Sequence, residues 1–166
     1  MCVEPDPILF RRIAAARPRD VCLNVGIGLD STQSADFYIM RERTLNTFSR
    51  SEADEYVAKG YAIEKTIQVP LLNVNELIAK YFKPCPNVVS IDVEGLDLEI
   101  LKSFDFAKYR PEIFCVETAS FTTGEKDTAM LQFMAERGYR VFADTYLNTI
   151  FVDAKQLATI TSVAAV

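Results

Sequence analysis

Residues 88–101 read VVSIDVEGLDLEIL, which is a buried strand followed directly by the start of a helix. The first six residues are nearly all apolar, as is typical of a strand that is covered on both faces of a sheet. Leu96 and Ile100 then follow the spacing of one helix face. Two carboxylates, Asp92 and Glu94, lie at the transition between the two elements. This order of elements indicates an α/β layer architecture.

The rest of the chain repeats the alternation of strands and helices. Residues 111–118, PEIFCVET, form a second buried strand, which also ends in an acid, Glu117. Because a short helix separates the two strands, we expect 88–93 and 111–116 to be adjacent parallel strands at the centre of a largely parallel sheet. Further strands are expected at 1–4, 20–28, 35–40 and 64–72, a closing antiparallel hairpin at 139–144 and 148–152, and helices at 73–82, 96–104 and 126–138.

Local signals refine these boundaries. Asp6 is an expected N-cap of a first helix, and Ser51 with Asp54 resembles a capping box at the start of another. Pro70 interrupts the strand at 64–72 and cannot donate a ladder hydrogen bond, so we expect this strand at an edge of the sheet.

Composition and charge argue against several classes of partner. The chain has 166 residues, a net charge of −5 and a pI near 4.8. A nucleic-acid interface would need a basic face, so we expect no nucleic-acid partner. No apolar run approaches the roughly 20 residues of a membrane span, and no signal peptide is visible. We therefore expect no membrane partner and a cytoplasmic location.

The residue types present also limit the chemistry. The absence of histidine excludes His-based triads and histidine metal sites. An enzyme of this composition would use carboxylate, Lys, Tyr, Cys or Ser/Thr chemistry. The four cysteines contain no CxxC pair and are expected to be reduced: Cys2, Cys22, Cys85 and Cys115.

Acids follow three of the expected parallel strands. Ligands of open α/β sheets bind outside the carboxyl ends of the strands, so we expect Glu4, Asp92, Glu94 and Glu117 on one rim of the sheet. An acid in the place of Glu4 commonly accepts hydrogen bonds from ribose hydroxyls, and Asp30 is a further cofactor-binding candidate. Asp92 and Glu94 would point to the same side of the strand. One could take a proton from a substrate hydroxyl while the other orients it or raises its pKa.

Two other interpretations of these acids stay open. Each acid alone is also what the dipole of a helix N-terminus favours. Asp92, Glu94 and Glu117 together would offer oxygen ligands to a hard divalent cation, as in a metal-dependent hydrolase. We favour a site without a metal.

Several motifs together carry a family resemblance. From about residue 3 to residue 152 the chain resembles the FkbM-type family of S-adenosylmethionine-dependent methyltransferases. The most specific part is the string IDVEG-x-x-x-x-x-L followed by the string P-x-x-x-x-VE. The matching segments are VEPDP, LNTFS, VVSIDVEGLDLEIL, RPEIFCVET and ERGYRVFADTYLNTIFV.

The resemblance implies a class I methyltransferase-like (Rossmann-like) sheet with a C-terminal antiparallel hairpin. It implies methyl transfer from S-adenosylmethionine, usually to an oxygen of a small molecule or sugar. By the same resemblance, Glu4 would bind the cofactor ribose. Asp92 and Glu94 would lie in the active cleft, with Glu117 beside them.

The resemblance also indicates a missing element. Members of the family carry a first strand with a glycine-rich loop before the segment that contains Glu4. These 166 residues begin at that segment, so we expect the first strand to be missing and S-adenosylmethionine to bind weakly or not at all. We expect residues 1–153 to form one methyltransferase-like domain and residues 154–166 to form a weakly patterned tail.

Substrate contacts and alternative functions complete the expectations. Asn46 and Thr47 in one segment, and Tyr146 and Asn148 in the final hairpin turn, are candidate substrate contacts. A shortened homologue without catalysis would instead be a binding or scaffold protein, and a homodimer through an exposed sheet edge is possible.

Overall fold

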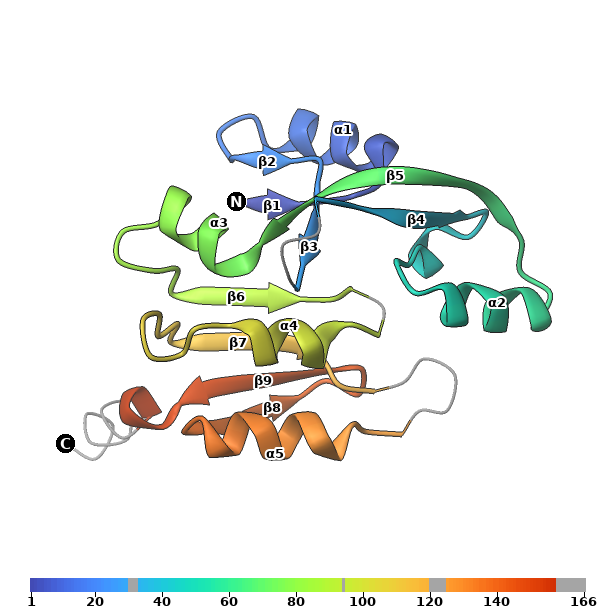
Figure 1. Cartoon of the computed structure of the whole chain (residues 1–166). Helices are drawn as coiled ribbons and strands as arrows, with labels where there is room; N and C mark the ends of the chain where they lie inside the picture. Colours follow the sequence, from blue (N-terminus) through green and yellow to red (C-terminus); the bar gives the residue numbers. More distant parts are fainter. Residues whose placement is uncertain (30–32, 94, 120–124, 158–166) are drawn as a thin grey trace. The chain divides into compact units, whose positions relative to one another are not determined.

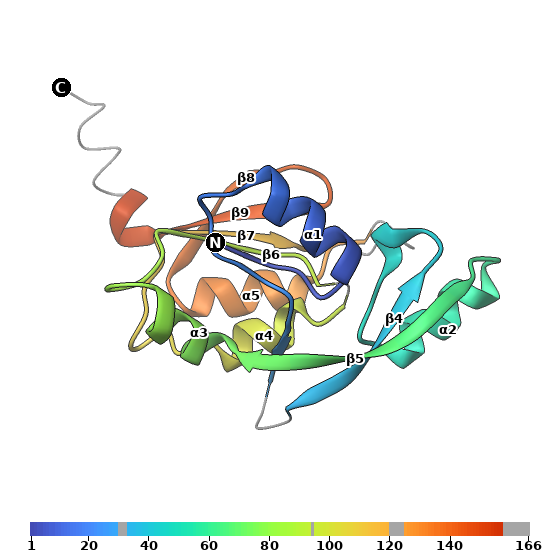
Figure 2. The ribbon, with the colours of Figure 1, turned by 90° about the horizontal axis from the view of Figure 1, so that it is seen from above.

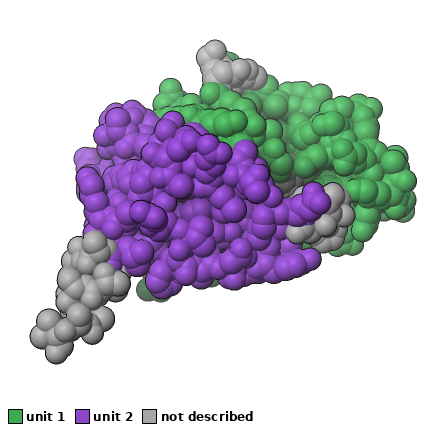
Figure 3. Space-filling model, turned by 90° about the horizontal axis from the view of Figure 1, so that it is seen from below, with its two compact units in different colours: residues 1–77, 93–104 green, residues 78–92, 105–166 purple. Residues whose placement is uncertain are grey.

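The computed structural model describes residues 1–29, 33–93, 95–119 and 125–157. The chain divides into two compact units (Figure 3). Unit 1 comprises Met1–Leu77 and Val93–Phe104, and unit 2 comprises Ile78–Asp92 and Asp105–Val166. Each unit is described by itself below. In the described ranges, no helix has the length and apolar character needed to cross a membrane.

The N-terminal part of unit 1 is a parallel strand–helix–strand element. β1 (Cys2–Val3) pairs with β2 (Cys22–Leu23), and α1 (Pro7–Ala16) connects them. Asp6 caps α1 as expected, because its carboxylate accepts the N–H groups of Ile8 at 2.7 Å and Leu9 at 3.3 Å. The strand expected at 20–28 is instead two short strands. The break is at Asn24, whose side-chain amide donates to the carbonyl oxygens of Glu4 and Pro5.

A three-stranded sheet forms the other part of unit 1. Its order is β3–β5–β4, with β3 (Gly26–Gly28) parallel and β4 (Ser34–Met40) antiparallel to β5 (Ile63–Asn73). Figure 2 shows β4 and β5 running side by side. A buried cluster of β4 and β5 consists of Phe37, Ile39 and Val69, and Phe48 and Ile67 pack against it. This cluster forms because apolar side chains of β4 and β5 share one face.

The expected edge position of the strand with Pro70 is wrong, because β5 is the middle strand of this sheet. The N–H of Leu71 donates to the carbonyl of Gln33 at 2.9 Å, so the nitrogen of Pro70 faces away from β4. On the opposite side, β3 pairs with β5 only from Leu71 onward. The proline therefore lies where β5 changes partners, and its missing donor disrupts neither ladder.

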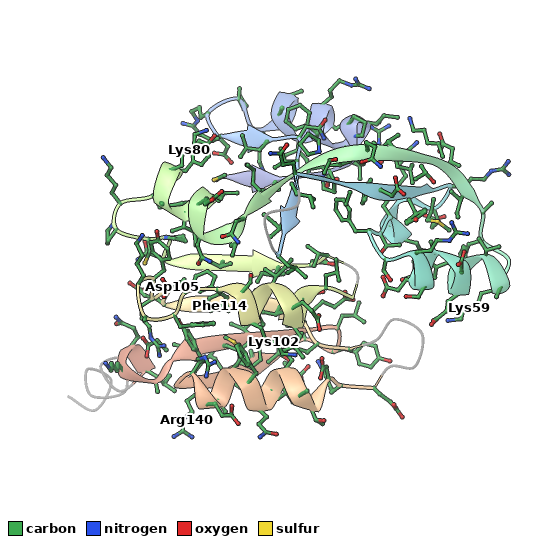
Figure 4. The ribbon with its side chains drawn as sticks, in the orientation of Figure 1. Lys59, Lys80, Lys102, Asp105, Phe114 and Arg140 are labelled. Carbon is green, nitrogen blue, oxygen red and sulfur yellow. The ribbon has the colours of Figure 1, made fainter. Side chains whose placement is uncertain are left out.

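The next helix of this part begins at a polar cap. α2 (Arg50–Ala58) follows η1 (Arg43–Leu45), a short 3-10 helix. Its N-cap is Ser49, whose hydroxyl accepts the N–H of Glu52 at 3.3 Å, so the capping box expected at Ser51 is wrong by two residues. Starting the helix at Arg50 buries Ala53 and Tyr56. Two more helices are α3 (Val74–Tyr81) and α4 (Asp97–Ser103); Figure 4 labels Lys59 at the end of α2 and Lys102 on α4.

Unit 2 contains a four-stranded sheet in the order β6–β7–β9–β8 (Figure 1). β6 (Val88–Ile91) and β7 (Ile113–Glu117) are parallel, whereas β9 (Asn148–Asp153) is antiparallel to both β7 and β8 (Tyr139–Asp144). Consequently β6, β7 and β8 run in one direction and β9 runs in the other. α5 (Thr128–Glu136) packs against β8. The expected hairpin and the adjacent parallel pair are both confirmed.

The expected central position of the 88–93 strand is wrong. β6 is an edge strand of its sheet, and Val88 is 57% exposed. β6 pairs on one side with β7, and no strand in the described part of the chain pairs with its other side. An apolar run indicates cover on both faces of a sheet and does not report how many strands pair beside it, so the sequence of β6 did not predict its edge position. β7, by contrast, has partners on both sides, as expected.

An aromatic cluster forms the core of unit 2. Phe106 lies 5.7 Å from Phe114, 6.0 Å from Phe133 and 5.9 Å from Tyr139, measured between ring centroids. Figure 4 labels Phe114 on β7. The Tyr139 hydroxyl is satisfied by the Pro111 carbonyl at 2.7 Å. Edge-to-face contacts of this kind add to the burial of the rings and fix the packing of α5 against the sheet.

Candidate active site

Asp92 directly follows β6 and Glu117 is the last residue of β7, the two neighbouring parallel strands of unit 2. β6 and β7 pair in register as far as Ile91, which lies opposite Val116. The next residues along the two strands are Asp92 and Glu117, and neighbouring strands lie about 4.8 Å apart. The two acids therefore lie together at the carboxyl ends of their strands, where ligands of open α/β sheets bind.

The surroundings of Asp92 alter its acidity. Asp92 is an exposed residue as a whole, but the protein covers part of its carboxyl group. This partial loss of water raises the pKa of Asp92 above its ordinary value. A carboxylate with a raised pKa is a better proton acceptor, so the environment of Asp92 suits general base chemistry.

One of the candidate substrate contacts lies beside Glu117, and another lies in the turn that precedes β9. Asn148, the first residue of β9, is the direct cross-strand partner of Glu117. Tyr146, in the turn before β9, is 71% exposed and adopts a left-handed conformation with φ of 74°. Its N–H donates to the carboxylate of Asp144 at 2.9 Å, which stabilises this conformation. The turn thus presents an aromatic side chain close in sequence to the partner of Glu117.

A polar network supports this end of the sheet. Lys126 donates to the Thr118 hydroxyl at 3.0 Å and forms an ion pair with Asp144 at 2.9 Å. The hydroxyls of Thr118 and Thr149 lie 2.6 Å apart and are buried. The lysine therefore links the segment after β7 to the end of β8. Sequence reasoning missed this residue, because no local motif marks a lysine whose partners come from other strands.

Glu4 lies at the end of β1 in unit 1. One carboxylate oxygen of Glu4 accepts the N–H of Asp6 at 2.8 Å. Partial burial raises the pKa of Glu4, and the nearby charge of Asp6 acts in the same direction while the backbone hydrogen bond opposes both. In the described ranges, the second carboxylate oxygen accepts no hydrogen bond. Glu4 belongs to a different unit from Asp92 and Glu117, so a shared rim for all three stays a prediction.

Asn46 holds the segment after η1 in place. Its side-chain oxygen accepts the N–H of Met40 at 2.8 Å, and its amide donates to Asp6 at 3.0 Å. Asp6 is fully buried and also forms an ion pair with Arg43 at 2.5 Å. Both polar groups of Asn46 therefore have partners inside the protein. A role as a substrate contact is untested, but the geometry gives Asn46 a structural role.

Thr47 is also directed into the protein, and it leads to an acid that sequence reasoning missed. Thr47 is 1% exposed, and its hydroxyl donates to Glu52 at 2.8 Å. Partial burial raises the pKa of Glu52, the charge of Glu55 adds to this, and the hydrogen bond from Thr47 opposes it. The sequence did contain a signal, because Ser49 and Glu52 have the spacing of a capping box.

Two of the predicted site residues, Glu94 and Asp30, lie outside the described residues. Within the described ranges, no group of three or more acids or cysteines is arranged to hold a metal ion. The glycine pair of Gly26 and Gly28 forms strand β3 rather than a loop.

Comparison with protein families gives a match over most of the chain. Residues 2–141 match a protein-family model described as the methyltransferase FkbM domain. Neither a curated protein nor a solved structure matches the chain.

Proposed function

Because the chain belongs to the FkbM methyltransferase domain family, we propose that it serves S-adenosylmethionine-dependent methyl transfer to a hydroxyl oxygen of a small molecule or sugar. The observation that carries the proposal is the alignment of Asp92 and Glu117 at the ends of two parallel strands. Such strand ends are where this class of sheet binds its ligands.

The sheet of unit 2 supports a class I methyltransferase arrangement. Three of its strands run in one direction, and β9 is inserted in the opposite direction between β7 and β8. This agrees with the mostly parallel sheet and C-terminal antiparallel hairpin that the family resemblance implies. Within the described part of the chain, one side of β6 has no partner strand, and the first strand of such a sheet would pair there.

The described residues fit one end of the cofactor. Glu4 lies at a strand end and has a carboxylate oxygen without a hydrogen bond in the described ranges, so it would accept a ribose hydroxyl. For the methionine end, Gly26 is packed against Phe48 and Leu71 and is no candidate for a cofactor loop. When bound, the cofactor would supply an electrophilic methyl group.

The acids of unit 2 would prepare the acceptor. Asp92 would take the proton of the acceptor hydroxyl as its oxygen bonds to the methyl group, and the electron pair of the broken S–CH₃ bond would stay on sulfur. Glu117 would accept a second hydrogen bond and orient the acceptor, because alignment supplies much of the rate in such reactions. Tyr146 and Asn148 would contact the acceptor beside Glu117.

The proposal is tested by identifying the methylated product and the atom that carries the new methyl group. S-adenosylmethionine with a ¹³C-labelled methyl group is incubated with the chain and a set of small sugars and hydroxy acids, and labelled products are detected by NMR. We expect an O-methyl signal that Asp92→Asn abolishes and that Asp54→Asn, at an exposed acid of α2, leaves unchanged. Methylation at nitrogen or carbon would contradict the acceptor class, and cofactor binding without any product would favour a non-catalytic binding protein.

A further inference from the structure

Glu52 is held in a defined position on the first turn of α2. Its N–H donates to the hydroxyl of Ser49, and one of its carboxylate oxygens, Oε2, accepts the hydroxyl of Thr47 at 2.8 Å. The Thr47 hydroxyl in turn accepts the N–H of Ser49 at 2.9 Å. Backbone and side chain of Glu52 are therefore both fixed by the segment that precedes the helix.

Helix capping does not explain the position of this carboxylate. In a capping box, the glutamate at the third helical position reaches back to the N–H of the N-cap residue. Here the N–H of Ser49 is satisfied by Thr47, and the Glu52 side chain extends to Thr47 instead. The carboxylate is thus available for another contact.

The Glu52 carboxylate lies against the backbone of Gly95. A Cβ atom added to Gly95 would lie 2.3 Å from Oε1 of Glu52 and 2.7 Å from its Cδ, distances at which real atoms overlap. Gly95 has a φ of +86°, which favours glycine, and follows the strand end that carries Asp92. The Glu52 carboxylate therefore fills the space that any side chain at Gly95 would need.

Among the described residues, Glu55 on the same helix is the charged group that acts on Glu52, and its negative charge favours protonation. Thr47 and Gly95, from the two neighbouring segments, carry no charge. A change of charge on Glu52 would therefore be felt directly at the Gly95 turn.

We propose that Glu52 is a positioning residue, which, anchored by Thr47, fixes the turn at Gly95, three residues after Asp92 in the chain. Its meaning for catalysis rests on the proposed methyltransferase function. Glu52 acts through the turn and is not assigned a contact with substrate or cofactor.

The contact is tested by NMR on the full chain. The amide signal of Gly95, one of six glycines, is followed as a function of pH. Because burial raises the pKa of Glu52, we expect the signal to move in a transition above pH 4.5. Glu52→Gln, which keeps the shape and removes the charge, should abolish this transition, whereas Glu99→Gln, at an exposed acid of α4, should keep it. A Gly95 signal that does not titrate in the native chain, or that titrates equally in Glu52→Gln, would overturn the proposal.

Activity separates this inference from the function on which it rests. If the native chain transfers methyl groups, Glu52→Gln should lower kcat more than it raises KM, because the turn lies three residues after Asp92, the proposed base. If no methyl transfer occurs but Gly95 titrates with Glu52, the proposed function fails and the positioning contact stands. If methyl transfer occurs and Gly95 does not follow Glu52, the positioning role is wrong.

Discussion

Replacing Gly26 by alanine tests whether the glycine pair of β3 serves packing. The φ of Gly26 is not in the left-handed region, so alanine introduces no backbone strain there. Its Cβ, however, would lie 2.4 Å from Cζ of Phe48 and 2.8 Å from a methyl carbon of Leu71. Phe48 packs against the buried cluster of β4 and β5, and Leu71 belongs to β5, so both side chains must shift by about 1 Å.

Overpacking of this size costs about 1–3 kcal/mol of unfolding free energy. For a chain of this length, 2 kcal/mol corresponds to a fall in Tm of about 4–8 °C. Phe48→Leu removes the outer ring atoms that the new methyl group would strike. The double variant Gly26→Ala/Phe48→Leu should therefore be more stable than the sum of the single effects predicts, by about 0.5–2 kcal/mol.

Urea unfolding of the four proteins, followed by circular dichroism, measures this coupling. The packing explanation would be refuted by additive effects, within about 0.3 kcal/mol. It would also be refuted if Gly26→Ala left stability unchanged but weakened binding of S-adenosylhomocysteine, since that result would make β3 a cofactor segment.

Three further outcomes follow from the described contacts. Ser49→Ala should cost about 1 kcal/mol in urea unfolding because it removes the cap of α2, whereas Ser51→Ala should change stability by less than about 0.5 kcal/mol; equal effects would contradict the assigned cap. The Arg110 guanidinium holds the pKa of Asp153 below its ordinary 3.8, so this pair stabilises the fold above pH 3.8 and its contribution is lost as the pH falls through the lowered pKa of the folded state. Asp153→Asn should therefore reduce the loss of unfolding free energy in acid, and an unchanged dependence of stability on pH in acid would count against the pair. Asp92→Asn should lower the rate of methyl transfer by about 10²–10⁴-fold, and a variant with native activity would exclude Asp92 as the base. In the native chain the rate should fall with decreasing pH along a limb above pH 3.8, because Asp92 must be ionised to act as base and its pKa is raised.

Local patterns predicted much of the fold. The apolar runs of β6 and β7 correctly predicted a parallel pair, and the turn residues between β8 and β9 correctly predicted a hairpin. The motifs predicted the family, which the family match over residues 2–141 confirms. These features depend on residues close in sequence or on the period of one strand, so the sequence contains them directly.

Features that depend on distant partners were harder to predict. The edge position of β6 is set by which strand pairs beside it, and composition cannot report that. Pro70 suggested an edge, but β5 places it where two partners meet. Thr47 was expected to face a substrate, yet it is buried against Glu52, because the turn before α2 folds the hydroxyl inward.

The candidate site likewise contains contacts that local patterns predicted and contacts that depend on residues distant in sequence. The alignment of Asp92 with Glu117 followed from the parallel pairing, and Asn148 joins Glu117 through the ladder of β9. Glu52 and Lys126 could not be identified from their neighbours in sequence, since their contacts are with Gly95 and with Thr118 and Asp144.

The most direct test of the central claim is an NMR titration of the full chain with S-adenosylhomocysteine, adenosine and methionine at about 1 mM each, where weak binding is still detected. We expect the first two ligands to shift the amide signals of Glu4 and Asp6, because Glu4 would hold the ribose, and we expect methionine alone to shift neither. Glu4→Gln should remove the shifts, while Glu112→Gln, at an exposed acid of unit 2, should not. Absence of any shift at Glu4 and Asp6, with native signals otherwise intact, would contradict the assignment of this strand end to the cofactor.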